Sequence, residues 1–264
     1  MKKIVLAGAA LATLSALPAY AQTGLEEAES TGIPSDWELS GNVGLFSEYR
    51  FRGIDFSDGD LALQGGIDLA HSSGFYVGTW ASNLAGFGDF GGSHVEVDLY
   101  AGFGGDFGSV GVYDVGVLWY LYPGTDDTDY VELYGSVGAD IAGAETTVGI
   151  AWAPDQANAD DSLYLYGDVG FGIPNTPIAL SAHLGYTDGF FGFGGLGTSG
   201  VSYDDNYIDY SIGASTDIYG LELGVAYVDT DIDEDREIDL GLAGPGVGSL
   251  IADDTVVVSI AYSF

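Results

Sequence analysis

The sequence contains no cysteine, very few basic residues and, beyond its N-terminal segment, no long hydrophobic run. The absence of cysteine excludes disulfide scaffolds, thiolate metal sites and cysteine nucleophiles. The lack of roughly 18 consecutive apolar residues excludes a helical membrane protein. With 40 acidic against 5 basic side chains, the chain repels polyanions, which argues against nucleic acid as a partner. The chain is nevertheless 47% hydrophobic, which is too apolar for a disordered protein of 264 residues.

The N-terminal segment has the pattern of a secretory signal peptide. Lys2 and Lys3 precede an apolar stretch, and Ala19-Tyr20-Ala21 has the small-x-small pattern of a cleavage site. The sequence therefore predicts a signal peptide over residues 1–21, a flexible lead-in over 22–36 and a single domain over 37–264. Removal of the signal peptide leaves Arg50, Arg52 and Arg236 as the basic side chains.

From Trp37 onward, apolar and polar residues alternate with the period of two that is typical of β-strands. We count about twelve such segments, an even number that suits a single-chain outer-membrane barrel. The predicted strands are 37–52, 61–70, 75–83, 94–103, 110–122, 130–139, 146–153, 163–171, 178–187, 207–215, 221–229 and 255–264. The fold class predicted is all-β, an antiparallel transmembrane β-barrel of the outer-membrane type.

The connections between these strands alternate in length. Tight turns rich in Gly, Pro, Asn and Asp follow every second strand, and mostly longer glycine- or acid-rich segments, such as 188–206 and 230–254, follow the others. Outer-membrane barrels have short periplasmic turns and longer external loops. We therefore expect the tight turns to face the periplasm.

The apolar face of the strands is predicted to contact lipid. Aromatic residues occur at both ends of this face, where amphipathic rings suit the two membrane interfaces. One predicted girdle comprises Trp37, Phe75, Phe103, Phe171, Tyr262 and Phe264, and the other comprises Tyr49, Phe51, Trp119, Trp152, Tyr186 and Tyr227. The last predicted strand closes on Phe264, which resembles the signal read by the barrel assembly machinery. That machinery and outer-membrane lipid are thus expected partners.

The opposite face carries too many charges for a packed core, so we expect it to line a water-filled pore. Arg50 and Arg52 are two residues apart and are expected to point inward from the first strand. There they would pair with Glu48, Asp68, Glu96 or Asp98, either neutralising the acidic lumen or clamping a substrate anion. The predicted pore-lining residues are Glu48, Arg50, Arg52, Asp68, Glu96, Asp98, Asp114, Glu132, Asp168, Asp209 and Glu222.

Several of these segments resemble those of the TorF-like porin family of proteobacterial outer-membrane proteins, a family of unknown function. The similarity lies in residues 41–44, 47–53 (SEYRFRG), 64–68, 73–83, 113–116, 120–124 and 132–134. It extends from about Ser40 to Phe264 and is strongest in the first half. The sequence departs from the family in the Gly- and Phe-rich stretch 190–200 and in the acidic segment before the last strand. The resemblance implies a barrel in the cell outer membrane and a porin role.

The predicted function is passive diffusion of small hydrophilic solutes through an outer-membrane porin. Acids at 55, 58 and 60, at 126, 127 and 129, and from 229 to 239 would make a negative outer mouth that favours cations. Adaptation to a saline habitat explains the acidity equally well. The alternative function is a closed or loop-plugged barrel with a structural or adhesive role.

Catalysis and cofactor binding find little support in the sequence. His183 and Ser181 share a strand face, but same-strand neighbours do not by themselves make a nucleophile and base, and no Gly-x-Ser-x-Gly elbow occurs. Asp229, Asp231, Asp233 and Asp235 have the spacing of the first ligands of an EF-hand loop. The segment lacks the glycine and the final glutamate that such a loop needs. We predict no enzyme activity and no cofactor, and loose divalent binding by this loop stays open.

Overall fold

The computed structural model describes residues 33–85, 92–126, 128–156, 160–189, 206–232 and 251–264. The predicted signal peptide, most of the lead-in and the stretch 190–200 lie outside the described residues. The strands are β1 (Trp37–Phe46), β2 (Arg50–Phe51), β3 (Ile54–Asp55), β4 (Ala62–His71), β5 (Phe75–Asn83), β6 (Val95–Asp106), β7 (Val112–Leu121), β8 (Tyr130–Ile141), β9 (Ala144–Ala153), β10 (Ser162–Gly172), β11 (Ile178–Asp188), β12 (Asn206–Ile218), β13 (Leu221–Thr230) and β14 (Thr255–Ser263).

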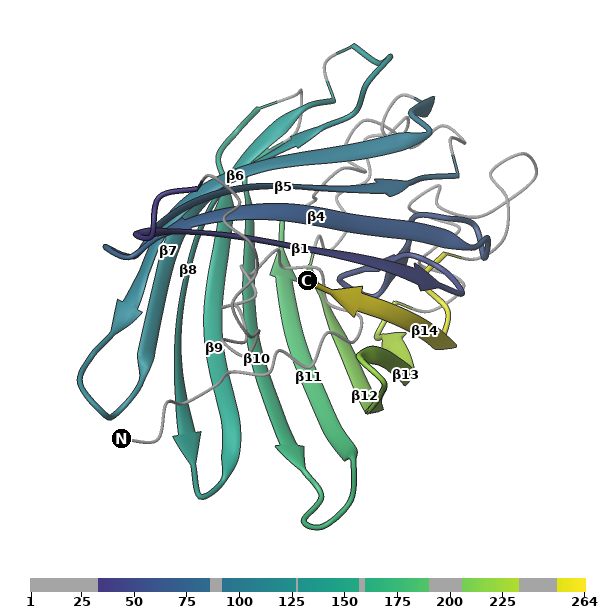
Figure 1. Ribbon diagram of the computed structural model, residues 1–264. Coiled ribbons are helices and arrows are strands. Elements are labelled where there is room, and N and C mark those ends of the chain that lie inside the picture. The colour runs from purple at the N-terminus through teal and green to yellow at the C-terminus, as the bar shows by residue number, and fades with distance from the viewer. Residues whose placement is uncertain (1–32, 86–91, 127, 157–159, 190–205, 233–250) are drawn as a thin grey trace.

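All strands except β2 and β3 join in one closed antiparallel barrel of 12 strands (Figure 1). Each strand pairs with its neighbours in the chain, and β1 closes the ring by pairing with β4 on one side and β14 on the other. At this seam Gly41 and Phe264 exchange two backbone hydrogen bonds of 2.9 Å. The predicted fold class and strand number are confirmed. Among the described residues, no helix is long and apolar enough to cross a membrane.

Short turns join alternate strand pairs at one end of the barrel, as predicted. Two of them are two-residue loops, Ala142-Gly143 and Tyr219-Gly220, in which both residues have positive φ. That conformation matches the twist of the flanking strands in a type I′ hairpin. Asp140 and Asp217 each accept a hydrogen bond from the loop glycine. The connections at the opposite end are mostly longer.

The outer surface of the barrel is apolar. Large aliphatic side chains are exposed all around it, including Val43, Ile67, Val117, Ile150 and Ile212. Such a continuous apolar surface is stable only against lipid or another apolar partner. Of the predicted girdles, Phe75, Phe103, Phe171, Tyr262, Phe264, Trp119, Trp152 and Tyr186 are exposed, and Trp37 and Tyr227 are half-buried.

The prediction for the first strand is wrong beyond Phe46. The chain leaves the wall at Ser47, turns inward and forms the short hairpin of β2 and β3 instead of continuing to Arg52. Tyr49 and Phe51, assigned to the outer aromatic girdle, are therefore buried inside the barrel. The chain bends at Ser47 and Glu48 and then reverses in a tight turn at Arg52-Gly53, where both residues have positive φ, so a straight strand cannot continue through this segment.

Candidate functional site in the barrel lumen

Residues 47–60, which we call the inner hairpin segment, fold into the lumen near the end with the longer connections. The Ser47 amide bonds to Val258 O, the Asp55 amide to Ile251 O and the Ala85 amide to Phe56 O. Asp55 belongs to this buried segment, so its prediction as an outer-mouth residue is wrong. The segment is thus tied to β14, to the residues before β14 and to the end of β5.

Arg50 holds the inner hairpin segment to the chain just before β14. Its guanidinium donates to Glu48 at 2.8 Å, to Ile251 O at 3.0 Å and to Asp253 O at 2.9 Å. Glu48 also accepts a hydrogen bond from Thr255. Arg50 therefore neutralises a neighbouring acid and donates to backbone carbonyls. Few of its N–H groups are left to bind a substrate anion.

Arg52 crosses the lumen to the far wall. It forms an ion pair with Glu132 at 2.7 Å, and its guanidinium lies 4.1 Å from the centre of the Tyr164 ring. Burial by itself lowers the pKa of Arg52, but the adjacent Glu132 carboxylate more than reverses this, so the pKa is raised above its ordinary value. The predicted pairing of the two arginines with Asp68, Glu96 or Asp98 does not occur.

Asp55 organises the tip of the inner hairpin segment. Its carboxylate accepts hydrogen bonds from the amides of Ser57 and Gly59 and from the Ser57 hydroxyl. Burial raises the pKa of Asp55, and those amides together with Arg50 oppose the rise. The carboxylate is thus a structural acceptor that holds the turn.

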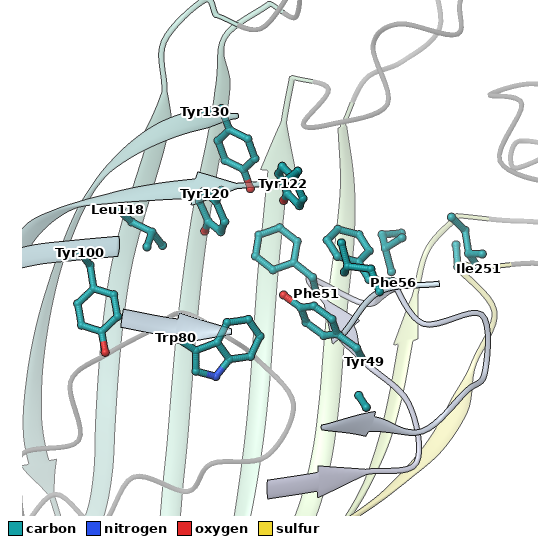
Figure 2. Close-up of a cluster of buried hydrophobic side chains, with 14 of the residues drawn as sticks. Tyr49, Phe51, Phe56, Trp80, Tyr100, Leu118, Tyr120, Tyr122, Tyr130 and Ile251 are labelled. Carbon is teal, nitrogen blue, oxygen red and sulfur yellow. The ribbon is translucent and has the colours of Figure 1, made fainter. Parts of the chain in front are cut away.

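Aromatic side chains fill the lumen around the inner hairpin segment (Figure 2). Tyr49 packs edge-on against Trp80 at 5.6 Å, and Phe51 packs against Tyr120 at 5.9 Å. Tyr120 in turn stacks on Tyr130 at 4.2 Å. The sequence analysis missed these inward rings, because it assigned aromatic residues to the lipid face alone. The signal available was that Tyr120 and Tyr130 share a strand face with Asp114 and Glu132, and that Trp80 lies on the face opposite to the outward Phe75.

Most predicted pore-lining acids accept hydrogen bonds from tyrosine hydroxyls. Tyr49 donates to Glu96, Tyr120 to Glu132, Tyr100 to Asp68, Tyr76 to Asp114 and Tyr164 to Asp209. On the inner side of the barrel, the structure buries Glu48, Arg50, Arg52, Asp68, Glu96, Asp98, Asp114, Glu132 and Asp209, and leaves Asp168 and Glu222 half-buried. Their contact with a water-filled path stays a prediction.

Inward tyrosines lie flat on the wall because glycines face them on the neighbouring strand. A Cβ on Gly78 would come within 2.3 Å of the Tyr100 ring, and one on Gly102 within 2.2 Å of the Tyr76 hydroxyl. Asp68, Gly78 and Tyr100 occupy one row across β4, β5 and β6. The missing side chain lets the Tyr100 ring cross β5 and reach Asp68.

The lumen is more open toward the short turns. Inward positions there are mostly small and half-buried, as at Gly102, Gly116, Thr147, Ser181 and Gly213. Among the described residues, inward side chains are thus small toward the short turns and charged or aromatic around the inner hairpin segment, a region that we call the constriction.

His183 belongs to a charged cluster and does not pair with Ser181. Its Nδ1 lies 2.6 Å from Asp168, and its Nε2 lies 3.0 Å from Asp209 and 2.8 Å from the Tyr164 hydroxyl. A general base for serine needs a ring nitrogen free to accept the hydroxyl proton. Both nitrogens already face carboxylates, so this geometry supports a structural cation in the wall.

These features define a closed antiparallel barrel with an apolar exterior and an acidic, partly filled interior. The chain belongs to a bacterial protein family of unknown function, Gcw_chp, whose model matches residues 29–264. The TorF-like resemblance is not itself confirmed by this match. No curated protein matches the sequence.

Solved structures of porins share the fold. The KdgM porin aligns with a TM-score of 0.54 at 11% identity, over 85% of this chain and 99% of that one. The NanC porin aligns at 0.52 and 9% identity, over 85% of this chain and 98% of that one. A structure of the KdgM porin in complex with disordered oligogalacturonate aligns at 0.52 and 11% identity, over 86% and 98% of the two chains. At these identities the similarity is one of fold.

Proposed function

We propose that this protein is a porin of the Gram-negative outer membrane that admits small hydrophilic solutes by passive diffusion and prefers cations. The observation that carries the proposal is that the outer face of the barrel is apolar while acids outnumber bases on its inner face. Asp68 and Asp114 accept hydrogen bonds from neutral tyrosines and have no basic partner among the described residues. Such a lumen attracts cations and repels anions.

The solute proposed here differs in charge from the ligand in the KdgM complex. Galacturonate carries a carboxylate, so an oligogalacturonate is a polyanion, which the acidic lumen of this chain would repel. The proposed solutes are therefore cationic or neutral. Outer-membrane lipid and the barrel assembly machinery are the partners proposed for insertion.

The inner hairpin segment favours a second candidate function, a closed barrel with a structural or adhesive role. Tyr49, Phe51 and Ile54 are almost completely buried inside the barrel, so the constriction is narrow. A channel through it would have a small unitary conductance.

Single-channel recording of the refolded barrel in a planar bilayer, with a salt gradient, separates the two functions. We expect small discrete steps and a reversal potential of the sign for cation preference. A reversal potential near zero would contradict the cation preference. Silence from protein shown to be folded by heat-modifiable gel migration would contradict the porin function and favour the closed barrel.

A further inference from the structure

Asp98 is a buried carboxylate with an oxygen for which the described residues provide no hydrogen-bond donor. It projects inward from β6 at the constriction and is only 3% exposed, and its Oδ1 has no hydrogen-bond partner. Burying an unpaired, charged carboxylate is unfavourable, so such a group takes up either a proton or a cation. The surroundings of Asp98 favour the cation.

Two aromatic residues flank Asp98 in the same row of the barrel wall. Trp80 on β5 and Tyr120 on β7 are its direct register partners, and both are buried in the lumen (Figure 2). Directly opposed residues on one sheet face have Cβ atoms about 5 Å apart. The Asp98 side chain is therefore flanked by the side chains of an indole and a phenol, and ring faces not already stacked, as Tyr120 is on Tyr130, attract cations.

The same lumen already holds an organic cation with this chemistry. The Arg52 guanidinium pairs with the Glu132 carboxylate and lies over the Tyr164 ring, and Glu132 also accepts from Tyr120. Asp98 is the register partner of Tyr120 on β6, and Trp80 is its register partner on β5. Arg52 has its ion pair with Glu132, so no arginine of the described residues pairs with Asp98.

A metal ion fits this site poorly. No group of three or more His, Asp or Glu side chains in the described part of the chain has the arrangement of a metal site. Glu96 projects inward two residues before Asp98 on the same strand, and its Oε2 is also without a hydrogen-bond partner among the described residues. Carboxylates beside aromatic rings suit an N–H-bearing organic cation, which donates hydrogen bonds to the oxygens and places its charge against the rings.

We propose that Asp98, Trp80 and Tyr120 bind the protonated amine of a small organic solute in the constriction. The inference rests on the proposed channel function, for which it names a solute class, the organic monoammonium ions. Asp98 supplies the charge and the hydrogen-bond acceptors, and the rings exclude water and favour the cation over a neutral analogue.

Isothermal titration of the folded barrel in detergent micelles with n-butylammonium chloride tests this. We expect saturable binding that Asp98→Asn weakens by roughly tenfold or more, through loss of one charge-assisted interaction. Asp68→Asn is the matched control, because Asp68 is equally buried but already accepts from Tyr100 at 2.6 Å; its affinity should change less than about twofold. Trp80→Leu gives a second variant, expected to bind severalfold more weakly than the wild type. Neutral n-butanol should not bind.

Equal affinity in the wild type and Asp98→Asn would overturn the inference. So would calcium binding that Asp98→Asn abolishes, if butylammonium does not bind at all. The titration does not depend on conduction. A silent barrel that binds butylammonium through Asp98 refutes the porin function and leaves this site standing, whereas a conducting barrel without such binding does the reverse.

Discussion

The ion pair between Arg52 and Glu132 should control how firmly the inner hairpin segment stays in the lumen. Both side chains are almost completely buried, at 7% and 3% exposure, and their atoms are 2.7 Å apart. Arg52→Met leaves Glu132 buried without its cation, and breaking a buried pair in this way costs about 3–5 kcal/mol. The loss falls on the docking of the segment, since the barrel wall does not depend on this contact.

A single thiol reports this docking directly. The chain has no cysteine, so Ser57→Cys introduces one thiol at a position with 0% exposure within the segment. If labelling requires local release of the segment, Arg52→Met in this background should accelerate thiol labelling by roughly a hundred- to a few-thousand-fold. Adding Glu132→Gln should restore much of the protection, because the uncompensated charge is gone. The reasoning would be refuted if Arg52→Met changed the labelling rate less than about threefold. It would also be refuted if Glu132→Gln left the rate of the Arg52→Met variant unchanged.

Three further predictions concern the wall, a turn and the constriction. Gly78→Ala should destabilise the barrel by about 1–3 kcal/mol in urea unfolding, because the new Cβ displaces the Tyr100 ring; Gly167→Ala, whose nearest neighbour would be 3.8 Å away, should cost less, and equal losses would contradict the account. Tyr219→Asn should stabilise the barrel by a few tenths of a kcal/mol up to about 1 kcal/mol in the same assay, since asparagine tolerates φ of 57° better; a loss of stability would count against it. Arg50→Ala should raise the single-channel conductance by loosening the inner hairpin segment, and an unchanged conductance would show that this segment does not limit the current.

The error in the first strand shows where pattern analysis fails. Residues 47–52 continue the alternation of the preceding strand, so periodicity alone extends that strand to Arg52. The Arg52-Gly53 pair was the local signal for a turn, because consecutive residues with positive φ favour a glycine in the second position. Where this segment docks depends on distant contacts. Arg52 meets Glu132, 80 positions away, and Arg50 meets Ile251, 201 positions away, and no local pattern reveals such contacts.

The strand number, the apolar exterior, the inward acids and the gathering of the short turns at one end of the barrel were all determined by the sequence itself. Each follows from a local property, the period of two or the chemistry of a turn, which is written in neighbouring residues. Only the tertiary structure decided which acids pair with a base, which tyrosines lie over which glycines, and that Asp98 Oδ1 has no donor in the described part of the chain. Those outcomes depend on which strands become neighbours and on what the inner hairpin segment fills, because partners of a buried charge are chosen by proximity in space.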